Sequence, residues 1–96
     1  MSAIYWPSKD ADEKLDYTLD WSARLGSDAI STSTWEIEGP DSLLVETTPS
    51  PANTLTETTI WLMGGTDKAT YTLTNIVTTT GGRTMQQTTL LGILAK

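Results

Sequence analysis

The alternation of side chains over residues 15–22, Leu-Asp-Tyr-Thr-Leu-Asp-Trp-Ser, constrains the fold more than any other feature of the sequence. Every odd position holds a large apolar residue, and every even position holds an acid or a hydroxyl. Successive side chains of a β-strand point to opposite faces, so the pattern predicts a strand with one buried and one solvent-exposed face. Asp16 and Asp20 would then lie about 13 Å apart, whereas the paired carboxylates of glycosidases lie roughly 5–9.5 Å apart. We therefore interpret the two acids as the exposed face of a strand.

Further segments along the chain also have strand character. Threonine, with 19 copies, is the most abundant residue and favours strands together with Val, Ile, Tyr and Trp. The expected strands cover residues 15–22, 29–37, 43–45, 54–63, 69–79 and 84–94. Short strands at intervals of roughly 8–15 residues predict an all-β protein, an immunoglobulin-like Greek-key β-sandwich of about seven strands with an extended N-terminal arm. A small barrel is the alternative architecture.

Two local features refine this prediction. Tyr71 stands near the start of the penultimate strand, where immunoglobulin-like folds often carry a tyrosine whose hydroxyl bonds to the upstream backbone. Gly81 and Gly82 lie between two strands, and such a pair predicts a two-residue hairpin loop in which both glycines take a positive φ.

Both ends of the chain carry apolar residues that a single small sandwich need not bury. Residues 1–14 are expected to form the arm and residues 15–96 the β-sandwich domain. Ile, Tyr and Trp are not normally exposed together, so the arm either folds back on its own sandwich or docks on a partner. The run from residue 90 to 95 is apolar on both faces, as in a central strand or a strand covered by another protein. The candidate partner-binding residues are Ile4, Tyr5, Trp6, Leu90, Leu91, Ile93 and Leu94.

Charge and missing residue types exclude several classes of function. The net charge is −6 and the six Lys and Arg residues are scattered, so we expect neither nucleic acid nor an anionic membrane as a partner. No segment is apolar for long enough to span a bilayer, and the first residues lack the pattern of a signal peptide. The chain has no His and no Cys, which removes the commonest general base and the usual zinc ligands. We therefore expect no enzyme activity, no catalytic residue, no metal and no cofactor.

The acidic stretch Asp10-Ala11-Asp12-Glu13 begins like a calcium-binding loop. An EF-hand loop requires Gly at its sixth position and Glu at its twelfth. Counted from Asp10, these positions hold Leu15 and Trp21, so the EF-hand motif does not match. A calcium site of another kind stays open at this point.

Five short motifs together resemble a family of small virion structural proteins of tailed bacteriophages and prophages. They are a Trp-Pro-x-Lys-Asp start, a Leu-Asp-Tyr-x-x-Asp-Trp strand, an Ile-x-Thr-Ser-x-Trp strand, a Trp-Leu-x-Gly-Gly-Thr turn and a Tyr-x-Leu-Thr-Asn…Gly-Gly-Arg-Thr hairpin. The motifs extend over most of the chain, while residues 38–57 are less typical. The resemblance implies an immunoglobulin-like fold, a place in the virion after assembly in the bacterial cytoplasm, and no catalytic residues.

The resemblance leaves the position in the particle open. The preferred interpretation is a capsid decoration or cement protein that binds the major capsid protein and stabilises the head, as a homo-oligomer on the particle. The alternative is a neck, tail or fibre adaptor that joins other virion proteins. A carbohydrate-binding adhesion module, with Tyr5 and Trp6 as sugar-stacking residues, is a second alternative.

Overall fold

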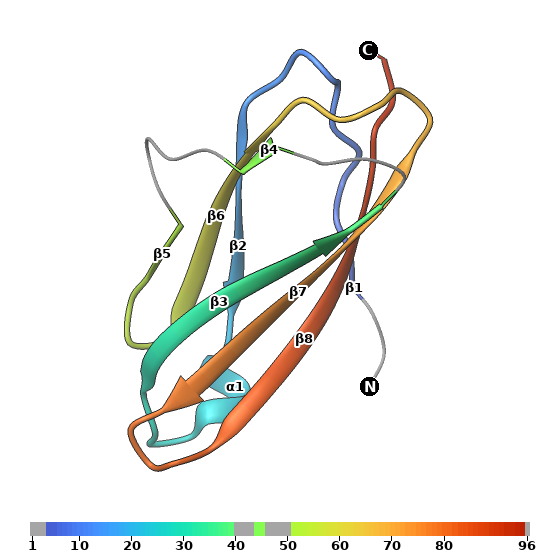
Figure 1. Cartoon of the computed structure of the whole chain (residues 1–96). Coiled ribbons are helices and arrows are strands. Elements are labelled where there is room, and N and C mark those ends of the chain that lie inside the picture. The colour runs from blue at the N-terminus through green and yellow to red at the C-terminus, as the bar shows by residue number, and fades with distance from the viewer. Residues whose placement is uncertain (1–3, 40–43, 46–50, 96) are drawn as a thin grey trace.

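A computed structural model describes residues 4–39, 44–45 and 51–95 of the chain (Figure 1). Its elements are β1 (Ile4–Tyr5), β2 (Leu15–Asp20), α1 (Ser22–Leu25), β3 (Ile30–Glu38), β4 (Leu44–Val45), β5 (Ala52–Asn53), β6 (Glu57–Met63), β7 (Thr70–Thr79) and β8 (Thr84–Gly92). The prediction of an all-β protein is confirmed. The helix α1 has four residues, and no helix within the described ranges is long and apolar enough to cross a membrane.

The strands form two sheets that face each other. One sheet has the order β1-β8-β7-β3, and the other has the order β2-β6-β4, with β5 also paired to β6. The predicted β-sandwich is confirmed. The finer assignment to the immunoglobulin-like Greek key stays a prediction. In its favour, β2, β4 and β6 share one sheet while β3, β7 and β8 share the other, which is the division of the B, D and E strands from the C, F and G strands in immunoglobulin domains.

The alternating segment forms β2, and its odd residues face the core. Tyr17 and Leu19 are buried, while Asp16, Thr18 and Asp20 are exposed. The two acids therefore belong to the exposed face, as predicted. The strand ends at Asp20 because its carboxylate accepts a hydrogen bond from the Ser22 N–H (2.9 Å), which turns the chain into α1. The predicted strand over residues 15–22 therefore ends two residues early, and Ser22, its expected last residue, is the first residue of α1.

The segment expected to be an arm folds back on the sandwich. β1 pairs in parallel with β8, and a further bridge joins Lys9 to Ile93. The Trp6 N–H donates to the Leu90 carbonyl (3.0 Å). Of the two alternatives for this segment, the structure shows packing against the same chain.

Two clusters of buried side chains form the core between the sheets. The first contains Tyr17, Ile60, Leu62, Tyr71, Leu73, Leu91 and Ile93, and the second contains Leu19, Trp21, Leu25, Ile30 and Val77. Trp6 packs against both clusters. Its ring stacks on Tyr17 with centroids 4.5 Å apart and tilts against Trp35 at 6.1 Å. The N-terminal segment thus contributes directly to the core.

A buried hydrogen-bond network joins the two sheets around Asn75. The Asn75 Oδ1 accepts bonds from the Trp21 Nε1–H (3.0 Å) and the Thr58 hydroxyl (2.7 Å). Its amide group donates to the Ser33 hydroxyl and the Thr34 carbonyl, both at 2.9 Å. Polar groups buried in this way stabilise the fold only when they are paired, so the network fixes the alignment of the sheets.

The loops next to β7 agree with one sequence prediction and correct another. The Tyr71 hydroxyl oxygen accepts a bond from the Thr66 N–H (2.9 Å), five residues upstream, as expected for a tyrosine corner. In the β7–β8 hairpin, only Gly82 has a positive φ (89°). The Gly82 N–H donates to the Thr79 carbonyl (3.0 Å), so the loop is longer than the predicted two residues. Gly81 is required for another reason, because a Cβ there would lie 2.8 Å from the Asp28 carboxylate.

Candidate binding surfaces

The predicted partner-binding residues separate into exposed and buried groups. Tyr5 is 77% exposed, Leu94 50% and Ile4 43%. Leu90 and Trp6 are half-buried. Leu91 and Ile93 are fully buried in the core, which corrects their assignment as contact residues. The run over residues 90–95 is apolar on both faces for two reasons. One face of β8 lies in the core, and the edge of the run is paired with the N-terminal segment through β1 and Lys9.

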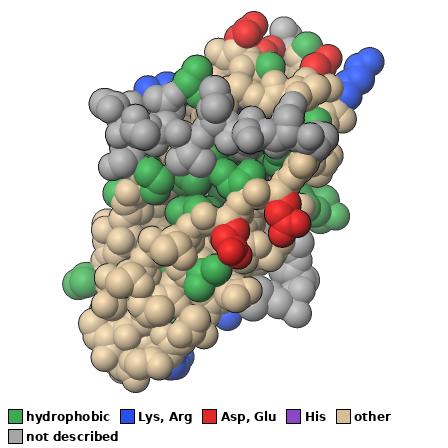
Figure 2. Space-filling view, viewed as in Figure 1, with side chains coloured by type: hydrophobic (Ala, Val, Ile, Leu, Met, Phe, Trp, Pro, Cys, Tyr) green, Lys and Arg blue, Asp and Glu red, His purple; other side chains and the backbone are tan. Residues whose placement is uncertain are grey.

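The outer faces of β7 and β8 carry no charged side chain and form a surface that we call the threonine face, which borders the exposed Glu36 and Glu38 of β3. Pairing of β7 with β8 places the outward side chains of the two strands opposite one another, in rows across the sheet. Hydroxyls also meet across the strands, as between Thr74 and Thr88 (3.2 Å). In Figure 2, much of the lower half of the molecule is likewise free of acidic and basic side chains. The threonine face consists of Thr72, Thr74, Ile76, Thr78, Thr84, Gln86, Thr88 and Leu90. In a chain of net charge −6, such a face suits protein contact, because the centres of protein interfaces are depleted in charged residues.

A groove lies between the open edges of the two sheets. Its volume is about 240 Å³, and it is lined on one side by Ile4 and Trp6 and on the other by residues 18–21 of the β2 region. Arg24 and Gln87 complete the lining. The Arg24 guanidinium carbon lies 4.9 Å from the centroid of the Trp21 ring, and its Nη1 donates to the Gln86 carbonyl (3.0 Å). The groove therefore combines aromatic walls with an edge of β2 to which none of the described strands is paired.

Lys9 is fully buried, and its main chain pairs with Ile93 close to the C-terminus. Its Nζ donates to the carbonyls of Asp10 (2.9 Å) and Gly64 (2.8 Å). Burial lowers the pKa of Lys9, and the carboxylates of Glu13, Asp10 and Asp12 oppose that shift. The side chain thus ties the N-terminal segment to the loop between β6 and β7. In the sequence, Lys9 is only one of six scattered basic residues, and nothing predicts this role.

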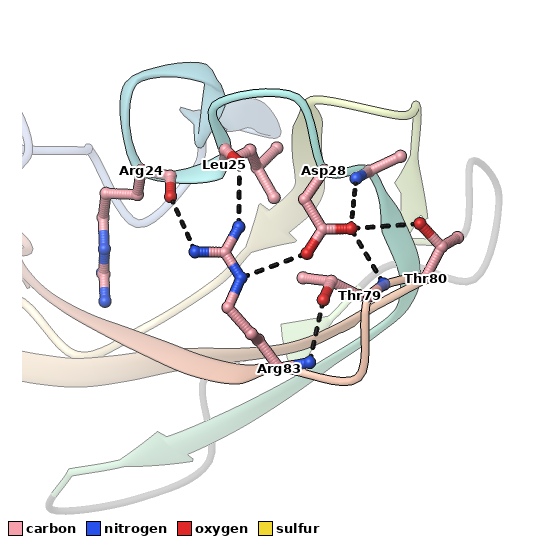
Figure 3. Close-up of polar contacts among 8 residues, drawn as sticks. Arg24, Leu25, Asp28, Thr79, Thr80 and Arg83 are labelled. Carbon is pink, nitrogen blue, oxygen red and sulfur yellow. Dashed lines mark hydrogen bonds and ion pairs between the residues drawn. The ribbon is translucent and has the colours of Figure 1, made fainter.

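Asp28 and Arg83 form a cluster of polar contacts (Figure 3) between α1 and the β7–β8 hairpin, which lie at the end of the sandwich away from the C-terminus (Figure 1). The Arg83 Nε donates to Asp28 Oδ2 (3.1 Å), and its Nη2 donates to the Leu25 carbonyl (2.8 Å). Asp28 Oδ1 accepts bonds from the N–H groups of Ala29 (2.8 Å) and Gly81 (2.9 Å). Hydrogen bonding by the Thr79 side chain and by these N–H groups holds the pKa of Asp28 well below its usual range. The cluster fastens the β7–β8 hairpin to the end of α1.

The acids of the N-terminal segment have local structural roles. The Asp10 Oδ1 accepts from the Asp12 N–H (2.9 Å), and the Glu13 Oε1 accepts from the Asp10 N–H (2.8 Å). Within the part of the chain that the structure describes, no three His, Cys, Asp or Glu side chains gather in a way that could hold a metal ion. These contacts stabilise the turn that leads into β2.

Comparison with known proteins gives the family. A family model described as "Podophage GP4 fiber-tail adaptor protein gp77" matches residues 9–92. The chain belongs to this family. It is therefore a structural protein of a phage virion, and the description agrees better with the adaptor alternative than with capsid decoration. A search of curated proteins finds no match.

The part of the chain that matches the fiber-tail adaptor family contains most of the fold. It begins at Lys9 and ends at Gly92, so it includes β2 to β8, Lys9 with its two carbonyl partners, and the Asp28–Arg83 cluster. β1 and the exposed Leu94 lie outside it. The surfaces that lie within the family match are the threonine face and the β2 side of the groove.

Proposed function

We propose that this protein joins a fibre to the tail of a podophage virion, and that it acts by binding alone. The observation that carries the proposal is the match of residues 9–92 to the fiber-tail adaptor family. The compact sandwich supports it, because an adaptor must present binding surfaces on a rigid body. The uncharged threonine face and the exposed Tyr5 and Leu94 supply such surfaces. The absence of His and Cys from the sequence supports a role without catalysis.

The proposal also concerns copy number. Copies of an adaptor follow the symmetry of the tail to which they attach, so they are few per particle and related by rotation about the tail axis. A decoration protein of the head would instead be present in many copies on the capsid surface. The major capsid protein is then not the partner, and the contacts are with tail and fibre proteins.

The test is removal of the gene from the phage, followed by electron microscopy of the particles. We expect filled, intact heads with tails that lack fibres, and restoration of the fibres when the wild-type protein is supplied from a plasmid. Particles with normal fibres but with unstable or emptied heads would show that the protein decorates the capsid, and would overturn the proposal.

A further inference from the structure

The β2 edge of the groove has the geometry of a strand-addition site. The Trp21 N–H donates to the Thr56 carbonyl (2.8 Å), and this pair continues the antiparallel register in which Asp20 lies opposite Glu57. Backbone groups in an antiparallel pair point alternately toward the partner strand and away from it. Because Trp21 bonds toward β6, the N–H and C=O groups of Thr18 and Asp20 point away from β6. They lie along the groove, which both residues line.

The groove offers an added strand an apolar floor. Trp6 and Trp21 line the groove beside the edge of β2 that no described strand covers, and the partly exposed Ile4 also lines it. Arg24 is held by its contacts with the Trp21 ring and the Gln86 carbonyl. A peptide strand that pairs with β2 directs every second side chain into this apolar space. In recognition by β-augmentation, the backbone hydrogen bonds supply affinity and the pockets for alternate side chains supply specificity.

The exposed face of β2 indicates the charge of the incoming strand. Asp16 and Asp20 flank Thr18 on this face. Hydrogen bonding by Ser22 lowers the pKa of Asp20, so its carboxylate is ionised at neutral pH. Opposite charges across neighbouring strands stabilise pairing and like charges oppose it. The added strand therefore carries Lys or Arg on its outer face.

The same acids argue against a second copy of this chain as the occupant. Antiparallel pairing of two β2 strands about Thr18 would place Asp16 of one copy opposite Asp20 of the other at both ends. Such a pair brings like charges together and is destabilised. The occupant is instead a segment of a different protein.

We propose that the β2 edge binds an extended segment of a partner virion protein in which basic residues alternate with apolar ones. The partner strand pairs with the backbone of Thr18 and Asp20, places its apolar side chains in the groove, and directs its basic side chains toward Asp16 and Asp20. This inference rests on the proposed adaptor function, because it specifies how the adaptor holds one of the proteins that it joins.

The first test uses a synthetic peptide as the probe, Lys-Val-Lys-Val-Lys-Val-Lys with blocked ends, and a control peptide with Glu in place of Lys. We expect the Lys peptide to shift the amide NMR signals of Thr18 and Asp20 in the full-length protein, and the Glu peptide to bind about tenfold more weakly or not at all. Asp16→Lys should reduce the preference for the Lys peptide. Signal shifts confined to the threonine face, or equal binding of both peptides, would overturn the inference.

The second test blocks the strand edge directly. The Thr18 N–H points away from β6, so Thr18→Pro removes no ladder bond, but it prevents pairing of an added strand. Thr18→Ala is the matched control, because both variants lose the hydroxyl bond to Thr59 (2.9 Å) and only the proline blocks the edge. We expect Thr18→Ala to bind the Lys peptide as wild type does and Thr18→Pro to bind about tenfold more weakly. Equal binding by the two variants contradicts strand addition, and if Thr18→Pro does not fold, the signal shifts of the first test decide.

The same two variants separate this inference from the proposed function. They are supplied from a plasmid to phage that lack the gene. If both variants restore fibres equally, strand addition at β2 is wrong while the adaptor function stands. If wild type itself restores no fibres, the adaptor function is wrong. The peptide experiments still test strand addition at β2 independently of that result.

Discussion

The two ends of the sandwich are each fastened by one basic side chain, but the two side chains work in different surroundings. Lys9 is fully buried and donates to two main-chain carbonyls from different segments. Arg83 has a side chain that is 46% exposed, and it bonds to a carboxylate as well as to the carbonyls of Arg24 (3.3 Å) and Leu25. Both residues add side-chain bonds to loops that are also held by main-chain bonds, as from the Lys68 N–H to the Ile93 carbonyl (2.6 Å) and from the Thr80 N–H to the Ala29 carbonyl (2.9 Å).

The comparison shows that the contribution of similar hydrogen bonds to stability depends on how deeply they are buried. At the surface, water replaces a lost hydrogen bond, so an exposed ion pair contributes little to stability. In the interior, a carbonyl left without a donor keeps its full desolvation cost. The Lys9 end should therefore be the more sensitive to substitution, even though Arg83 makes more bonds.

The largest effect is expected from Lys9→Ala. The substitution leaves the carbonyls of Asp10 and Gly64 without their buried donor and removes the packing of the side-chain stem. We expect the free energy of unfolding to fall by about 3 kcal/mol, measured by urea denaturation. Lys14→Ala is the control, because Lys14 is exposed on the same segment and its loss should cost less than about 0.5 kcal/mol. Equal losses for the two variants would mean that the buried contacts of Lys9 contribute no more to stability than those of an exposed lysine.

A second titratable group near this end responds to alkaline pH. Burial raises the pKa of Tyr17 to about 12, and the charges of Glu13 and Asp16 act in the same direction. In the unfolded chain the phenol ionises near pH 10, so unfolding is favoured as the pH rises from about 10 to 12. Wild type should lose about 2 kcal/mol of stability over this range through Tyr17.

Tyr17→Phe isolates this contribution. Among the residues that the structure describes, the buried Tyr17 hydroxyl has no hydrogen-bond partner, so the variant should differ from wild type by less than about 1 kcal/mol at neutral pH. At alkaline pH the variant should lose less stability than wild type. Lys9 acts in the opposite sense, because its lowered pKa makes stability rise with pH up to 10.5, and this term is common to both proteins. Parallel pH curves for the two proteins would refute the role of Tyr17.

The third effect concerns the exposed end. Arg83→Ala removes the guanidinium group that links Asp28 to the end of α1, and we expect the free energy of unfolding to fall by about 1 kcal/mol. Arg83→Lys keeps the charge but cannot reach two carbonyls and a carboxylate at once, so it should recover only part of the loss. Full recovery by lysine would show that charge alone matters. A loss as large as that of Lys9→Ala would remove the contrast between the two ends.

The sequence predicted the sandwich and most of its strands because these depend on local alternation. The pattern at Tyr17 and Leu19 reports directly which face is buried. The roles of Lys9 and Arg83 depend on carbonyls up to 59 positions away, and no local pattern encodes such distant partners. The burial of Lys9 could not be expected from its residue type, because lysine is almost never fully buried.

Among the candidate contact residues, burial could not be told from exposure in a run that is apolar on both faces. Leu91 and Ile93 point into the core, whereas Leu94 is exposed just beyond the strand. The groove at β2 was also missed, because it exists only where the edges of two sheets meet. The regular alternation of β2 indicated its two faces but gave no information about its free edge.

The smallest effect is expected at acid pH, and it distinguishes the carboxylate of Asp28 from the arginine that it holds. The lowered pKa of Asp28 means that the folded state keeps this group ionised at pH values where the unfolded chain has already bound a proton. Its contribution to stability is therefore complete above the ordinary pKa of 3.8 and is lost as the pH falls through the folded pKa. In Asp28→Asn the amide cannot titrate, and its NH₂ group faces the donating Arg83 Nε in place of a carboxylate oxygen. The stability difference between wild type and Asp28→Asn, measured by urea denaturation from about pH 6 to about pH 2, should therefore shrink with falling pH. A difference that stays constant over this range would mean that the hydrogen bonds to Asp28 do not depend on its charge, and that the exposed end of the sandwich is held by geometry alone.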